Sequence, residues 1–170
     1  MISLTSCNVT NYKFITQDLI DQYQWSESDL KKIQFYTSED IILKRQRSGN
    51  MSQITDGEIT VIDGQKLEEV VIKKGTAGVL LFQPKANRLA ISFDAKDDSK
   101  FLMFGPNPKA NDRYMLLASE WDRQRGKVTY GDKKYWINAN QLLASLLIDI
   151  KKINKVDITS DNPTGRTIND

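Results

Sequence analysis

The fold class of this chain is decided by the stretch 128–137, VTYGDKKYWI. Its centre, Gly131-Asp132, separates two short runs that are rich in β-branched and aromatic residues. This arrangement is typical of a β-hairpin with a tight two-residue turn. Aromatic pairs across a hairpin stabilise it, so we expect Tyr130 and Tyr135 to meet. The stretch therefore predicts antiparallel β structure.

The same pattern extends outward from this hairpin. From Gln34 onward, runs of about five to eight residues are separated by Gly, Asp, Asn or Pro, as in sandwiches and barrels. Among them, Leu89, Ile91 and Phe93 alternate with small or polar residues, which indicates a half-buried strand. We predict a mainly β fold, a single antiparallel β-barrel or sandwich of about eight strands with a short N-terminal helical segment.

Three segments carry more specific expectations. Residues 58–62 and 67–73 flank an Asp-Gly turn and predict a second hairpin. The polar stretch 45–55 predicts a loop, and the basic run 44–47, which overlaps its start, predicts a solvated strand end. The segment 142–153 fits a helical stripe and a strand face equally well, and the β-branched residues in its second half favour one long strand.

Two helix-start signals precede the β pattern. Thr16 and Ser26 are residues favoured at a helix N-cap, and acidic residues follow each of them within the first turn. We therefore expect two short helical turns between residues 16 and 33, packed on the β body that follows.

Composition limits the chemistry available to this protein. The 170 residues include no His and a single Cys, so Ser-His-Asp and Cys-His catalytic groups and ordinary zinc sites are excluded, as is a disulfide within the chain. Lys+Arg is 24 and Asp+Glu is 22, a balance that gives no reason to expect a nucleic-acid partner. We predict no catalytic residues, no metal and no cofactor. Carboxylates remain the only acid/base candidates.

One group of residues fits a sugar-binding or sugar-cleaving cleft, which needs stacking aromatics and, for cleavage, two carboxylates. Glu120 and Asp122 flank an aromatic residue at the end of a predicted strand. The aromatic residues that could form a ligand-binding face are Trp121, Tyr130, Tyr135 and Trp136. The alternative interpretation places the same aromatics in the core and in the hairpin.

The N-terminal sequence Leu4-Thr5-Ser6-Cys7 resembles the lipobox of bacterial lipoproteins. In that family the cysteine becomes the first residue of the mature protein and carries lipid, so the resemblance implies lipid attachment at Cys7. The polar residues 8–11 would form the tether that usually follows. A lipobox follows a basic and apolar leader, whereas three residues precede Leu4 here. Either a leader lies upstream of Met1 or Cys7 is an ordinary free cysteine.

In outline, a lipobox, a short polar tether, two helical turns and a β body resemble small lipoproteins of Bacteroidetes-type envelopes. The resemblance implies an outer-membrane anchor facing the periplasm, with a lipid surface and an envelope protein or glycan as partners. We therefore predict a non-enzymatic envelope lipoprotein that acts as a binding or assembly module. The alternatives are a soluble, cytoplasmic β-barrel that binds a small molecule or carbohydrate, and a carboxylate-only hydrolase. The expected division of the chain is a lipobox-like segment and tether at 1–15, a β-rich domain at 16–156 and a flexible tail at 157–170.

Overall fold

A computed structural model describes residues 11–47, 52–55, 58–61 and 66–156. Strands dominate these residues, and the helices are few and short, so the predicted mainly β class is confirmed. Seven strands form one antiparallel sheet and five form another, an arrangement consistent with a sandwich, and the described strands close no barrel. The described ranges hold 14 strands, more than the sequence predicted, because several have only three or four residues and leave no clear alternation.

The elements and their bounds are as follows. The larger sheet contains, in spatial order, β1 (Tyr12–Phe14), β14 (Leu146–Asp149), β2 (Phe35–Thr37), β7 (Ala77–Lys85), β8 (Arg88–Ser92), β9 (Phe101–Asn107) and β10 (Arg113–Leu116). The smaller sheet contains β11 (Glu120–Asp122), β12 (Arg125–Tyr130), β13 (Lys133–Asn138), β3 (Ile41–Arg47) and β6 (Lys66–Ile72). A separate pair joins β4 (Ser52–Thr55) to β5 (Glu58–Val61). The helices are α1 (Gln17–Tyr23), α2 (Glu27–Leu30) and α3 (Ile150–Val156), with 3-10 turns η1 (Pro108–Ala110) and η2 (Ala139–Leu143).

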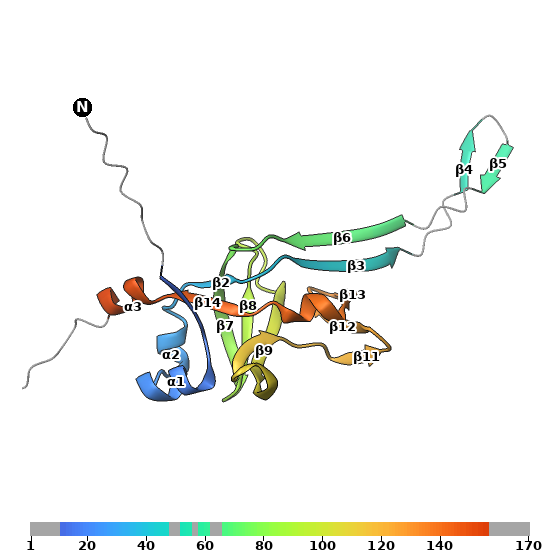
Figure 1. The fold of residues 1–170 in the computed structure, drawn as a ribbon. Coiled ribbons are helices and arrows are strands. Elements are labelled where there is room, and N and C mark those ends of the chain that lie inside the picture. Colours follow the sequence, from blue (N-terminus) through green and yellow to red (C-terminus); the bar gives the residue numbers. More distant parts are fainter. Residues whose placement is uncertain (1–10, 48–51, 56–57, 62–65, 157–170) are drawn as a thin grey trace, which may run out of the picture.

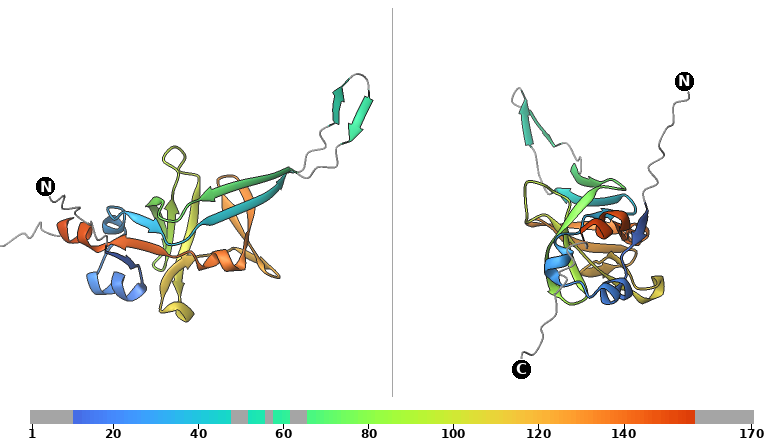
Figure 2. Two further views of the ribbon diagram at one scale, coloured as in Figure 1. Left: turned by 45° about the horizontal axis from the view of Figure 1, so that its top comes forward. Right: turned by 90° about the vertical axis from the view of Figure 1, so that its left-hand side faces the viewer.

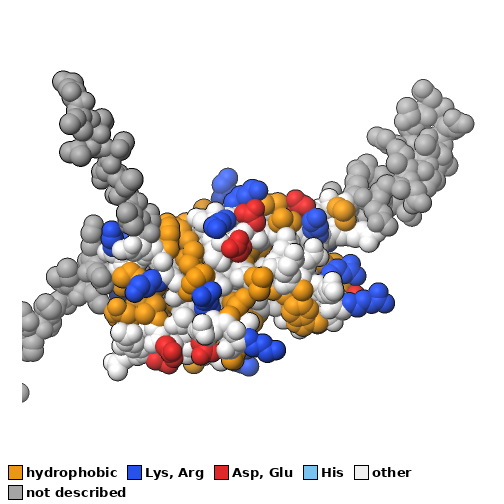
Figure 3. All heavy atoms as spheres, viewed as in Figure 1, with side chains coloured by type: hydrophobic (Ala, Val, Ile, Leu, Met, Phe, Trp, Pro, Cys, Tyr) orange, Lys and Arg blue, Asp and Glu red, His pale blue; other side chains and the backbone are white. Residues whose placement is uncertain are grey.

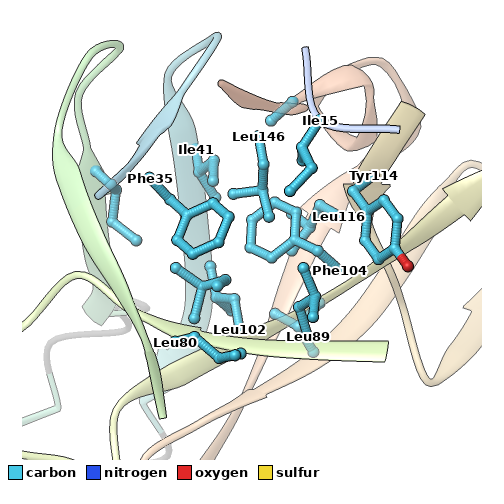
Figure 4. Packing of buried hydrophobic residues seen from close by; sticks show 14 of the residues in the cluster. Ile15, Phe35, Ile41, Leu80, Leu89, Leu102, Phe104, Tyr114, Leu116 and Leu146 are labelled. Atoms are coloured by element: carbon cyan, nitrogen blue, oxygen red, sulfur yellow. The ribbon is translucent and has the colours of Figure 1, made fainter. Parts of the chain in front are cut away.

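The chain passes back and forth between the two sheets, so both contribute to one core. It leaves the larger sheet after β2 and after β10, and it returns before β7 and before β14. Figures 1 and 2 show β3 and β6 extending together from the body as a two-stranded ribbon. Figure 4 shows the centre of the core, where Phe35, Phe104 and Tyr114 pack among aliphatic side chains from both sheets.

Both predicted helix starts are confirmed. The Thr16 hydroxyl accepts a hydrogen bond from the Leu19 amide at the start of α1. Ser26 and Asp29 form a capping box at the start of α2. Ile20 and Leu30 bury their side chains in the core, which holds these short helices in place.

The predicted hairpin between 58–62 and 67–73 is wrong. β5 pairs with β4, whereas β6 pairs along its whole length with β3. The β3–β6 pairing sets Lys44 opposite Glu69 and Arg45 opposite Glu68, and opposite charges at facing positions favour this register. The predicted loop at 45–55 is corrected by the same pairings, because β3 continues to Arg47 and residues 52–55 form β4.

The prediction of one long strand over 142–153 is also wrong. The segment begins in η2, continues as the four-residue strand β14 and ends in α3. β14 is paired on both sides, with β1 and with β2, so residues 146–149 follow the strand period. The Asp149 carboxylate then accepts a hydrogen bond from the backbone amide of Lys151, and the chain turns into α3. The strand period therefore holds over residues 146–149, and the helical period holds from residue 150 onward.

The described body begins close to the N-terminus. β1 joins the larger sheet at Tyr12, and Ile15 is fully buried, so the chain enters the fold before residue 16, where we expected the domain to start. Cys7 and the predicted tail at 157–170 lie outside the described residues.

Candidate functional site

The outer surface of the five-stranded sheet carries a tryptophan at its centre. Residues that face each other on neighbouring strands lie on the same side of a sheet. One such row crosses all five strands, and its members are Glu120, Lys127, Trp136, Lys44 and Glu69. Trp136 thus lies between two lysines, and each lysine lies beside a glutamate.

The cations around Trp136 contact its ring and are neutralised by carboxylates. Lys127 Nζ lies 5.4 Å from a ring centroid and Arg125 Cζ lies 5.1 Å from one, both within reach of a cation–π interaction. Lys127 Nζ also lies 3.1 Å from Glu120 Oε2, and Arg125 Nη2 lies 3.3 Å from Asp122 Oδ2. These contacts position the indole on the sheet and leave its surroundings close to electrically neutral.

A groove of about 410 Å³ opens beside Trp136. Its lining is Ile42, Lys44, Arg45, Gln46, Leu67, Arg125, Trp136, Asn138 and Gln141. Within the described part of the chain, the side-chain amides of Gln46, Asn138 and Gln141 make no hydrogen bond. Asn138 even occupies the N-cap position of η2 without capping it. The groove therefore combines an aromatic surface with three amides that are available to donate and accept hydrogen bonds.

The structure places two of the four predicted aromatic site residues in the core. Tyr130 and Tyr135 are buried, and their rings meet edge to face with centroids 6.3 Å apart, so the predicted cross-strand pair is confirmed. The Tyr135 hydroxyl donates to Glu68, which also accepts from Lys133. These hydrogen bonds hold the pKa of Glu68 below its ordinary value, and burial raises the pKa of Tyr135.

Trp121 does not share a face with Trp136. Trp121 faces Gly126 across the β11–β12 pair, whereas Trp136 faces Lys127, the next residue of β12. Consecutive residues of a strand point to opposite sides of the sheet, so the two indoles belong to opposite faces. Trp121 is 58% exposed at the sheet edge. The four aromatics thus form no single cluster, and Trp136 is the one among them that lines the groove.

The predicted carboxylates lie at the rim of this surface as partners of cations. The hydrogen bond from Lys127 holds the pKa of Glu120 below its ordinary value. A general acid in glycoside cleavage needs a raised pKa, which comes from burial or a neighbouring negative charge. Asp122 is engaged by Arg125. Among the described residues, no group of three or more His, Cys, Asp or Glu side chains is arranged to hold a metal ion.

Sequence reasoning missed most of the groove. The basic run at Lys44 predicts a solvated strand end, and no local pattern distinguishes Gln46, Asn138 and Gln141 from other polar residues. One local signal was present, because Trp136 alternates with Tyr135 and Ile137 along the hairpin and so had to leave the core face. The neighbouring β3 residues could not be placed, since β3 is about 90 positions away in sequence and pairs with β13 only in the tertiary fold.

Comparisons with known proteins give no relative for this chain. No family model, curated protein or solved structure matches it. None of its described helices is long and apolar enough to cross a membrane.

Proposed function

We propose that this protein is a non-enzymatic binding module that holds a neutral glycan against Trp136 in the groove of the five-stranded sheet. The observation that carries the proposal is the indole on the sheet surface beside three amides without hydrogen bonds of their own. A sugar ring presents an apolar face of C–H groups, which stacks on an aromatic ring, and hydroxyls, which pair with amides.

The size and charge of the groove support a small, uncharged ligand. Its volume of about 410 Å³ falls within the range of about 300–1,000 Å³ that is common for small-molecule sites. The cations nearest Trp136 are each engaged by a carboxylate, so little positive charge remains for an anionic ligand. Binding rather than cleavage is favoured, since Glu120 is exposed and its pKa is lowered.

The test is a titration of the full chain with a panel of neutral oligosaccharides, followed by tryptophan fluorescence and isothermal calorimetry. We expect Trp136→Ala to abolish the response, and Asn138→Ala to weaken binding by about tenfold through the loss of one hydrogen bond to the ligand. Trp121→Ala is the matched control, because it removes an exposed indole from the opposite face. Equal losses in the Trp121 and Trp136 variants, or no binding across the panel, would refute the proposal.

We also propose that the protein is anchored to the envelope through lipid on Cys7, with the body on the periplasmic side of the outer membrane. The support is the lipobox-like motif that ends at Cys7. Intact mass and detergent partitioning of the full-length gene product test this proposal. Lipidated protein should enter the detergent phase, and Cys7→Ser should keep it in the aqueous phase. An unmodified Cys7 in the mature protein would contradict the anchor.

A further inference from the structure

A second surface, on the larger sheet, differs in character from the Trp136 groove. One row of facing residues crosses four strands, and its members are Phe14, Leu147, Tyr36 and Ala77. Tyr12 and Val79 extend the row on the same side, and they are 46% and 44% exposed. We call these six residues the apolar band. Figure 3 shows such a band in orange over β1, β14 and β2.

The apolar band is unusual for the solvent side of an antiparallel sheet, which is normally polar. The corresponding row on the five-stranded sheet is charged at four of its five positions. In the band, the rings of Tyr12 and Tyr36 instead meet with centroids 5.0 Å apart. Contiguous exposed apolar surface of this kind marks an interaction site.

Cations border the apolar band. Arg113 Cζ lies 3.9 Å from the ring centroid of Phe14. Lys152 Nζ donates to the Tyr36 hydroxyl at 3.1 Å and lies 5.7 Å from the centroid of its ring. Strand β14 ends in an acidic residue, Asp149. Its side chain is 8% exposed and accepts a hydrogen bond from the backbone amide of Lys151. Two cations, Arg113 and Lys152, therefore contact rings of the band, and the acidic residues Glu39 and Asp40 line a cavity with Phe14 and Arg113.

The position of the band relative to Cys7 indicates what covers it. Tyr12 follows Cys7 by five residues, a length of chain that spans no more than about 18 Å. A lipid on Cys7 therefore keeps β1 close to the bilayer surface. Tyrosine side chains favour the interface between lipid and water, and lysines beside it are attracted to anionic headgroups.

We infer that the apolar band lies against an anionic bilayer surface, so that the four strands β1, β14, β2 and β7 form the membrane-facing side of the protein. This inference rests on the proposed anchor at Cys7 for its orientation. The surface itself consists of residues of the folded body, so its affinity for lipid is measurable without the anchor.

The experiment is co-sedimentation of the full chain carrying Cys7→Ser with vesicles of phosphatidylcholine, alone or mixed equally with phosphatidylglycerol. We expect binding to the mixed vesicles and little to the neutral ones. Lys152→Gln should weaken binding by about fivefold, the usual contribution of one cation near an anionic surface. Tyr12→Ser should weaken it at least fivefold. The control is Lys134→Gln, which removes an exposed lysine from the five-stranded sheet.

These results separate the lipid surface from the anchor and from other occupants. All the substituted side chains are exposed, and unchanged thermal midpoints would show that each variant folds. Equal binding to both kinds of vesicle, no binding, or an equal loss in the Lys134 variant would overturn the inference. Dimerisation of the chain through Tyr12 in sedimentation analysis would also overturn it, in favour of a second copy. Lipidation at Cys7 is measured separately by mass, so the failure of the anchor and that of the surface are distinguishable.

Discussion

Tyr114 offers a stringent test of the core, because its ring and its hydroxyl have separable effects on stability. The side chain is fully buried, and its hydroxyl donates a hydrogen bond of 2.5 Å to Gln17 Oε1 in α1. Burial, with a contribution from the negative charge of Asp21, raises the pKa of Tyr114 to about 12, and the charge of Arg88 opposes this rise. Tyr114→Phe keeps the ring and removes both the hydrogen bond and the titration.

The expected effect of Tyr114→Phe changes with pH. Near pH 7 the variant should lose about 1 kcal/mol of unfolding free energy, the usual net contribution of one hydrogen bond. A tyrosine in the unfolded chain ionises near pH 10. The higher pKa in the folded state stabilises the wild-type protein fully below about pH 10, and this contribution declines as the pH rises toward 12. Between pH 8 and 11 the unfolding free energy of the wild type should fall by about 1.4 kcal/mol through this titration, and that of the variant should not.

Urea unfolding of both proteins at several pH values from 8 to 11 measures this difference. We expect the wild type to be more stable at pH 8 and the two proteins to cross at about pH 10.6. All other titrating groups are common to both proteins and cancel if they act independently of position 114. Parallel stability curves over this range would refute the argument that the phenol is held neutral in the core.

Three further substitutions test packing and hydrogen bonding, each by urea or thermal unfolding. Gly78→Ala should destabilise by about 1–3 kcal/mol, because the added Cβ would lie 2.7 Å from Phe93 Cε1, and a neutral effect would show that this ring moves freely. Ser26→Ala should cost about 1 kcal/mol through loss of the cap of α2, whereas Ser26→Asn should restore most of it. Ser38→Ala should cost about 1–3 kcal/mol, since the buried Ser145 amide loses its acceptor, and an unchanged midpoint would contradict that hydrogen bond.

The apolar band and the Trp136 groove belong to different sheets, and this separation gives the proposed module a simple organisation. Strands β1, β14, β2 and β7 carry the surface assigned to lipid, whereas β3, β6, β12, β13 and η2 line the groove. Substitutions in one surface should therefore leave binding at the other unchanged. Trp136→Ala in the vesicle assay and Lys152→Gln in the glycan titration check this independence.

Features that depend on near neighbours could be predicted from local sequence alone. The Gly131-Asp132 turn defined the β12–β13 hairpin, and its alternation separated Tyr135 from Trp136. Thr16 and Ser26 defined the starts of both short helices, because a cap depends on residues within one turn. The absence of His limited the chemistry in the same direct way.

Features that depend on distant partners became visible only in the folded chain. β6 pairs with β3 rather than with β5, a choice that follows from side-chain pairs more than 20 residues apart. Residues 142–153 displayed two periods at once, and the pairing of β14 with both β1 and β2 selected the strand for only four residues. Gln46 and Trp136 line one groove because β3 lies beside β13. Pairing between strands far apart in sequence is set by burial and register across the whole sheet, which no local pattern contains.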